Sequence, residues 1–174
     1  ESQVRRSTAL HPRLRGGGAY LVGPMARYSL NFDRLSAVAQ QAAREAGLGT
    51  TCTNPYRSIV VRAVEVVQAL DEAVRLTADY LEPDAPAVEV TPRAGVGWAA
   101  TEAPRGLLYH RFAVAADGSI AEALIVPPTS QNQPCIEEDL VSMIGDVLDQ
   151  PDEIIRARAE QTVRNYDPCI SCAT

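Results

Sequence analysis

Residues 54–81 read NPYRSIVVRAVEVVQALDEAVRLTADYL, and they form the strongest helical pattern of the chain. Asn54 can cap this helix, and Pro55 would occupy its first position. Polar side chains recur every three or four residues and make one stripe, formed by Glu65, Gln68, Glu72, Arg75 and Asp79. Nearly every other position is apolar. A helix with so narrow a polar face is mostly buried, by its own domain or by a partner.

Three further segments have helical patterns. Residues 33–46 combine helically spaced apolar side chains with Asp33 as an N-cap and Gly47 as a stop. Residues 135–149 carry three acidic residues in their first turn, where the helix dipole favours them. Residues 151–165 open on a proline and have arginines toward their end. These patterns predict a mainly α domain.

A small β-hairpin is the β-structure that we expect. Residues 107–115 and 119–126 read as its strands, around the turn signal Asp117-Gly118. Residues 127–134 read PPTSQNQP and predict a polar loop. The fold class is therefore mainly α, with α+β character.

The other segments predict no regular element. We expect irregular chain over residues 1–20, a tight Gly-Pro turn in 21–27, a linker from Pro83 to about residue 92, and a glycine-rich segment over 93–106. Residues 1–174 would thus form one unit, with a helical part, 1–82, and a part that combines the hairpin with two helices, 93–174.

Composition narrows the class of protein. The chain has 174 residues, enough for one domain with a sizeable core. Its net charge of −6 argues against a nucleic-acid partner, because such proteins carry a basic surface. No stretch approaches the roughly 20 apolar residues of a membrane span. Four cysteines in a chain of this size do not predict a disulfide framework, so we expect a reducing compartment, the cytoplasm.

The segment with the most chemical information is DPCISCAT, residues 167–174. Cys169 and Cys172 are three positions apart, so both thiolates can bind one metal. A four-thiolate zinc or iron-sulfur site would need a second pair of ligands, and Cys52 and Cys135 are single and far apart. A thioredoxin-like pair would open a helix after a strand. This pair follows a predicted helix instead.

The same segment resembles the C-terminal signature of the large subunit of nickel-iron hydrogenases, Asp-Pro-Cys-x-x-Cys-x-x-His. Three more segments look like motifs of that family and stand in the family's order. They are Gly23-Pro24-Met25-Ala26-Arg27, Glu102-Ala103-Pro104-Arg105-Gly106 and Val126-Pro127-Pro128-Thr129-Ser130-Gln131-Asn132. The resemblance covers about residues 8–174. The form of the last segment is more similar to the cytoplasmic, cofactor-coupled branch than to the periplasmic uptake branch.

The resemblance implies a nickel-iron centre with carbon monoxide and cyanide ligands on iron. Cys169 would be a terminal nickel thiolate, and Cys172 would bridge nickel to iron. Thiolates are soft ligands that suit these metals. Thr129 and Ser130 would donate hydrogen bonds to iron-bound cyanide, with a register uncertain by one residue because of the Pro-Pro pair. The reaction implied is reversible heterolytic cleavage of dihydrogen.

The resemblance also implies a group of residues above the metals. Arg105 would point its permanently charged guanidinium over them and stabilise developing charge without reorganisation. Pro104 and Asp167 would belong to the same canopy. Without the family context, Arg105 reads equally well as a surface arginine, and Asp167 reads as a turn former before proline.

Other residues have plainer interpretations. Arg27 would anchor its turn by backbone hydrogen bonds, and His110 would be a structural histidine. Cys52 and Cys135 match no ligand position and read as ordinary thiols. We expect the polar stripe of residues 65–79 to serve solvent exposure, a partner contact or helix pairing rather than a proton path.

Two departures from the family pattern matter. The family supplies two more cysteine ligands and a nearby glutamate from its N-terminal part, and this chain has neither. The chain would therefore be a fragment, a split subunit or the remainder of a longer chain, with the rest of the large subunit as a partner. The final histidine, where a maturation protease cuts and where a magnesium or iron ion binds nearby, is also absent after Thr174.

Further partners follow from the resemblance. We expect an iron-sulfur small subunit that accepts the electrons, because this chain lacks cysteines for clusters of its own. Nickel-insertion factors would load the metal, and diaphorase-type subunits would pass electrons to a two-electron carrier.

Two alternatives remain open at this point. A non-catalytic relative, such as the quinone-site subunit of respiratory complex I, would share the fold without the metal. The paired cysteines argue against it. A small zinc-binding module, in which Cys169 and Cys172 hold a single zinc, would contain zinc alone.

Overall fold

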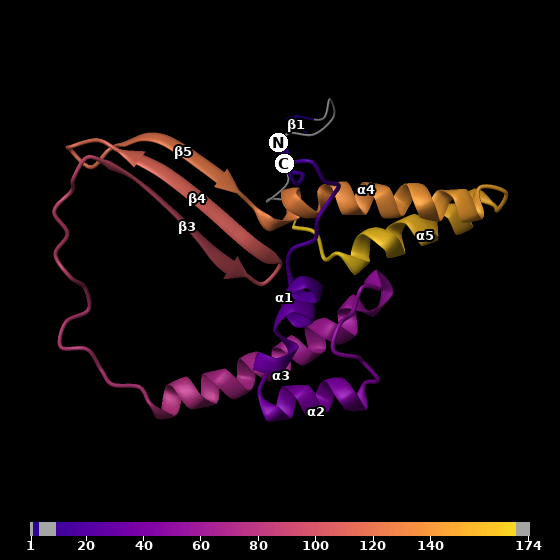
Figure 1. The fold of residues 1–174 in the computed structure, drawn as a ribbon, viewed down its shortest axis with the longest axis horizontal. Helices are drawn as coiled ribbons and strands as arrows, with labels where there is room; N and C mark the ends of the chain where they lie inside the picture. The colour runs from indigo at the N-terminus through magenta and orange to yellow at the C-terminus, as the bar shows by residue number, and fades with distance from the viewer. Residues whose placement is uncertain (1, 4–9, 170–174) are drawn as a thin grey trace.

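In the computed structural model, which describes residues 2–3 and 10–169, a helical body lies beside a small antiparallel sheet (Figure 1). The five α-helices of this part are α1 (Pro24–Asn31), α2 (Ala37–Glu45), α3 (Ser58–Ala78), α4 (Pro128–Val147) and α5 (Asp152–Asn165). The three-stranded sheet consists of β3 (Gly95–Ala103), β4 (Gly106–Val114) and β5 (Ile120–Val126). Short strands β1 (Ser2–Gln3) and β2 (Leu10–His11) pair with each other. The prediction of a mainly α, α+β fold is confirmed.

The helical core is formed by α1, α2 and α3. Its buried apolar side chains are Met25, Tyr28, Ala39, Ala43, Leu48, Cys52, Val61 and Val64. The small alanines of α2 let it lie close to α3, and the Tyr28 ring meets Phe32 edge-on at 5.5 Å between centroids. This core supports the first half of α3, which carries two residues of the site described below.

Only the first half of α3 is buried, on one face. Val61 and Val64 are 0% and 3% exposed, whereas Leu70 and Val74 are 63% and 70% exposed. The expectation that this helix is mostly buried is therefore wrong for the chain by itself. Its second half extends beyond α1 and α2 toward the linker that leads to β3 (Figure 1). Burial by a partner stays a prediction.

The beginnings of two helices differ from the prediction. Asn54 caps a 3₁₀ turn over Pro55–Arg57, where its Oδ1 accepts a hydrogen bond from Tyr56 N at 2.9 Å, and α3 follows from Ser58. Helix α2 is capped by Ser36, whose Oγ accepts from Ala39 N at 3.3 Å. Asp33 lies in a 3₁₀ turn over Phe32–Arg34 instead. The extended backbone of Leu35 separates that turn from α2.

The predicted hairpin is present as β4 and β5, and β3 extends it to three strands. The sequence predicts a glycine-rich segment over residues 93–106 and no strand, yet Gly95–Ala103 pairs antiparallel with β4. Backbone pairing with β4 outweighs the low strand preference of glycine and alanine. At the β4–β5 turn, Asp117 Oδ1 accepts from Ser119 N at 3.0 Å, and Gly118 has φ +86°.

Two further segments contain helix that the sequence does not predict. Residues 21–27 contain a turn, but helix α1 begins at once, at Pro24, because proline suits the first turn of a helix. Residues 127–134 are not a loop: α4 begins at Pro128 and runs through them, with Pro134 inside the helix. No helix in the described part of the chain is both long enough and apolar enough to cross a membrane.

Candidate functional site

Two glycines let two segments of the chain cross at backbone contact distance. Gly23 and Gly106 have φ +102° and +137°, which side chains rarely adopt. A Cβ atom on Gly23 would lie 2.5 Å from the carbonyl oxygen of Arg105, and one on Gly106 would lie 2.7 Å from Cγ2 of Val22. The two glycine-bearing motifs of the sequence therefore meet here. We call the meeting of residues 20–24, 102–107, 126–132 and 165–169 the junction.

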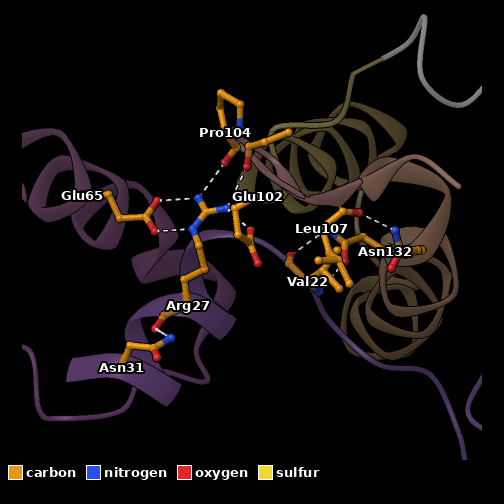
Figure 2. A network of polar contacts seen from close by, with 10 residues as sticks. Val22, Arg27, Asn31, Glu65, Glu102, Pro104, Leu107 and Asn132 are labelled. Carbon is orange, nitrogen blue, oxygen red and sulfur yellow. Dashed lines mark hydrogen bonds and ion pairs between the residues drawn. The ribbon is translucent and has the colours of Figure 1, made fainter. Parts of the chain in front are cut away.

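The first turns of α4 contribute a buried polar cluster to the junction. Asn132 accepts from Val22 N at 2.8 Å and donates to Val22 O at 3.0 Å (Figure 2). Gln131 donates to Leu107 O at 2.6 Å and accepts from Tyr20 at 3.2 Å. Both side chains are at most 6% exposed. They form hydrogen bonds with the backbone of neighbouring segments. Residue types that are typical of a loop therefore lie inside a buried helix.

Arg27 uses all five of its N–H groups to join α3 to the junction (Figure 2). Its Nε and Nη2 donate to the two carboxylate oxygens of Glu65 at 2.8 and 2.9 Å. Its Nη groups also donate to Glu102 at 2.7 Å and to the carbonyls of Ala103 and Pro104, both at 2.8 Å. Arg27 thus binds backbone carbonyls of the β3–β4 turn, and the prediction that it anchors its own turn is wrong.

The electrostatics of Arg27 match this geometry. Burial alone would lower the pKa of the guanidinium, but the hydrogen bonds and charges of Glu65 and Glu102 outweigh it and raise the pKa. The side chain is 22% exposed, so the cluster is partly screened from solvent. Arg27 therefore stays charged and holds the backbone that precedes Arg105.

The chain after α5 is bound at the junction by contacts with distant residues. We call residues 165–169 the tail. The Ser58 hydroxyl donates to Asn165 O, and the Tyr166 hydroxyl donates to Asp139 Oδ2 at 2.6 Å. Arg105 Nε donates to Asp167 O at 2.7 Å. These contacts fix the tail against α3, α4 and the β3–β4 turn.

Asp167 is held in an uncommon conformation between two arginines. Its φ of +48° lies in the left-handed region, where aspartate is tolerated better than most residues. Its Oδ2 lies 3.2 Å from Arg62 Nη1 and 3.5 Å from Arg105 Nε. The residue thus does more than form a turn before Pro168, because both guanidinium groups contact it.

The two predicted hydroxyl donors have different partners. The Ser130 hydroxyl donates to Pro127 O at 2.9 Å, one turn back in its own helix. Thr129 Oγ1 accepts a hydrogen bond from the amide of Cys169 at 3.0 Å. Both side chains are buried, at 2% and 3% exposure. Ser130 thus donates its hydroxyl proton to a backbone carbonyl. In the contact between Thr129 and Cys169, by contrast, the Thr129 hydroxyl acts as the acceptor.

The structure brings six of the seven predicted site residues together. Pro104, Arg105, Thr129, Ser130, Asp167 and Cys169 all belong to the junction or its tail. Cys172 lies outside the described residues. Sequence patterns give no role in the site to Arg62, Glu65, Gln131 or Asn132, although Glu65 belongs to the polar stripe and the two amides belong to a family motif. The signal for Arg62 and Glu65 was their spacing of three, which places them on one face of a helix.

The residues fit a thiolate-bound metal as part of a ligand set. Cys169 is partly exposed, and its amide is fixed beside a buried hydroxyl. No group of three or more histidine, cysteine or acidic side chains in the described ranges could hold a metal ion alone. A centre at this place would therefore need ligands beyond the described residues.

The two other cysteines are held by contacts of their own. Cys52 is buried in the helical core, and the Cys135 thiol donates to Tyr20 O at 3.3 Å. Burial, with smaller contributions from Glu138 and Asp139, raises the pKa of the Cys135 thiol. A raised pKa disfavours the thiolate, which is the form that binds metals. His110 stacks on Phe112 in β4, as a structural histidine would.

Tyr166 gives a pH-dependent prediction. Burial and the Asp139 carboxylate raise the pKa of its hydroxyl far above the ordinary value. The unfolded chain loses this proton near pH 10 while the folded chain keeps it, so the associated stability is lost as the pH rises above about 10. We expect Tyr166→Phe to lower the midpoint of thermal unfolding at neutral pH and to make its alkaline decline shallower. Parallel alkaline declines in the two proteins would contradict this.

The fold is that of hydrogenase large subunits. The chain superposes on a crystal structure of an NAD⁺-reducing NiFe hydrogenase in the H₂-reduced state with a TM-score of 0.74 and 31% identity, over 91% of this chain and 36% of the other. A NiFeSe hydrogenase of Dm. baculatum gives a TM-score of 0.61 at 24% identity, over 88% of this chain and 34% of that one, which shows the fold alone.

The sequence places the chain within a family. A family model described as nickel-dependent hydrogenase matches residues 11–174, so the chain belongs to the nickel-dependent hydrogenase family. It is 33% identical to sulfhydrogenase 1 subunit alpha of Pyrococcus furiosus, over 99% of this chain and 40% of that protein. It is 31% identical to the NAD-reducing hydrogenase HoxS subunit beta of Cupriavidus necator, over 90% of this chain and 34% of that protein. The chain thus spans less than half the length of these relatives.

Proposed function

We propose that this chain forms the part of a nickel-iron hydrogenase large subunit that supplies two metal-ligating thiolates, Cys169 and Cys172. With the rest of the subunit it acts as an oxidoreductase that cleaves dihydrogen reversibly and heterolytically. The observation that carries the proposal is the docked tail, in which Thr129 binds the amide of Cys169 and Arg105 binds the carbonyl of Asp167. The family match over residues 11–174 supports it.

When bound, a nickel-iron centre with carbon monoxide and cyanide on iron supplies two metals at which dihydrogen is polarised. The chain's own residues then have distinct roles. The Cys169 Sγ holds the departing proton, because a thiolate is a basic site. Arg105 stabilises developing charge from a fixed position, and Pro104 and Asp167 complete the canopy around it. Thr129 would donate a hydrogen bond to the iron ligands, and Ser130 would hold the first turn of α4 through Pro127 O.

The proposal includes partners that lie outside this chain. The rest of the large subunit would supply the other ligands, and an iron-sulfur small subunit would take the electrons. A maturation protease, nickel-insertion factors and diaphorase-type subunits complete the set, and a magnesium or iron ion would bind near the C-terminal motif. Relatives named as NAD-reducing and coenzyme F420 hydrogenases support the cofactor-coupled branch, for which we expect a cytoplasmic location. Residues 1–82 and 93–174 would be two parts of one unit.

An infrared spectrum of the natively purified complex that contains this chain tests the proposed function. We expect absorption bands from carbon monoxide and cyanide bound to iron, because few other biological groups absorb in that region. Their absence, with the rest of the large subunit shown to be present, would contradict the proposal. A preparation that contains zinc as its single metal would favour a zinc-binding module instead.

The two hydroxyl residues can be separated in the same experiment. Thr129→Val removes both the acceptor of the Cys169 amide and the proton that we assign to cyanide, so we expect it to shift the cyanide bands. Ser130→Ala removes a hydroxyl that already donates to Pro127 O. We expect it to leave the bands in place and to lower the free energy of unfolding by about 1 kcal/mol. A band shift in Ser130→Ala alone would reverse the two assignments.

A further inference from the structure

Arg62 and Glu65 form a polar pair on α3 that the proposed mechanism does not use. They are three positions apart, so they lie on the same face of the helix. Their side chains are 24% exposed each, in contrast to the well-exposed end of the helix. Both line an open groove of about 680 Å³, together with Pro104 and Asp167. The pair therefore lies beside both the β3–β4 turn and the tail.

Glu65 acts on the turn that carries Arg105. Both of its carboxylate oxygens bind Arg27, which fixes the plane of the guanidinium. The other N–H groups of Arg27 bind the carbonyls of Ala103 and Pro104 (Figure 2). Removing the Glu65 charge would free the guanidinium to rotate, and the backbone just before Arg105 would lose its fixed position.

Arg62 acts on the tail. Its Nη1 lies 3.2 Å from Asp167 Oδ2, two residues before Cys169. Its Nε is buried and has no hydrogen-bond partner among the described residues, so the ion pair with Asp167 is the contact that orients the group. Asp167 has a left-handed backbone directly before Pro168-Cys169. A contact that holds Asp167 in place therefore also restrains the direction in which the chain continues.

The two halves are joined where Arg105 Nε donates to Asp167 O at 2.7 Å. The contacts thus form a closed ring, from α3 through Glu65, Arg27 and the Arg105 turn to Asp167, and back to α3 through Arg62. Single half-exposed ion pairs contribute little to stability. A closed network, however, restricts each member through the others.

We propose that Arg62 and Glu65 are positioning residues that set the place of the Arg105 guanidinium relative to the Cys169 thiol. This inference rests on the proposed function, because the position of Arg105 matters where charge develops near Cys169. The pair touches no reacting atom. Its effect on turnover passes through Arg105.

A double-mutant cycle in the complete hydrogenase complex tests this. Glu65→Gln and Arg62→Gln are made singly and together with Arg105→Lys, and kcat and KM for dihydrogen are measured with an artificial acceptor. Because small misplacements of a catalytic group are costly, each single variant should lower kcat about tenfold to a hundredfold with little change in KM. In the Arg105→Lys background the same changes should cost less than about twofold.

Matched variants and a second readout keep the result interpretable. Glu72→Gln removes an exposed carboxylate that pairs with Arg75 on the same helix, and kcat should stay at the wild-type value. Infrared bands of the iron ligands should move in Glu65→Gln and Arg62→Gln, and not in Glu72→Gln. If Arg62→Gln does not fold, Arg62→Lys keeps the charge and should recover part of kcat.

Two results would overturn the inference and leave the proposed function standing. Fold-reductions that multiply in the double variants would show that Arg62 and Glu65 act independently of Arg105. Wild-type kcat and unmoved bands in both single variants would show that they position nothing. A wild-type complex with neither infrared bands nor turnover would overturn the proposed function itself, and the inference with it.

Discussion

Cys169→Ser is expected to abolish dihydrogen turnover and to remove nickel from the complex while the fold persists. A serine hydroxyl is a harder ligand than a thiolate and stays protonated at neutral pH, so it binds nickel poorly. The tail is held by main-chain groups, since Thr129 binds the amide of residue 169 and Arg105 binds the carbonyl of residue 167. The substitution leaves both contacts in place. Metal analysis and a hydrogen-oxidation assay measure the two effects.

The matched controls for Cys169→Ser are the same sulfur-to-oxygen change at Cys135 and Cys52. A serine at position 135 can keep the hydrogen bond to Tyr20 O, and position 52 lies in the helical core. Neither residue is a predicted metal ligand, so nickel content and turnover should stay at wild-type levels. Full nickel content in Cys169→Ser would show that this residue is not a ligand. Loss of nickel in Cys135→Ser would show that the ordinary-thiol interpretation is wrong.

Gly106→Ala is expected to lower the free energy of unfolding by about 2–5 kcal/mol, through overpacking and backbone strain together. The added Cβ would lie 2.7 Å from Val22 Cγ2 and 2.8 Å from Gly23 N, and the backbone neighbour cannot move as a flexible side chain would. Its φ of +137° is also unfavourable for alanine. The midpoint of thermal unfolding of the large subunit measures the loss.

Gly145→Ala supplies the control for that change. Gly145 lies inside α4, and a Cβ there would meet nothing within 4 Å. Alanine is a better helix former than glycine, so this variant should be more stable by about 0.5–1 kcal/mol. If Gly106→Ala and Gly145→Ala changed stability alike, the close crossing at the junction would not be what requires Gly106.

Local patterns predicted the elements whose causes are local. The periodicity of residues 54–81 and 151–165 located α3 and α5, and Asp117-Gly118 located the β4–β5 turn, because spacing and turn chemistry lie within a few residues. The start of α4 could not be found this way. Its polar residues satisfy the backbones of Val22 and Leu107, about 110 and 24 positions away, and no local pattern shows those partners.

The candidate site, too, could be predicted only in part from the sequence. Family motifs pointed to Pro104, Arg105, Thr129, Ser130, Asp167 and Cys169, and the structure gathers them at the junction. They could not show why the motifs contain glycine, which the crossing of residues 23 and 106 explains. Nor could they single out Glu65 from the polar stripe. Its ion pair with Arg27 depends on the packing of α1 against α3.

The tail also has a consequence for the order of folding. Its contacts join residues 27, 40, 62 and 107 positions apart in the chain, so none of them can form before distant segments have come together. Closing such long loops costs chain entropy that only the finished core and the completed junction offset. We expect the helices to form first and the tail to dock last. A docked Cys169 would then be a sign that the rest of the chain is already folded.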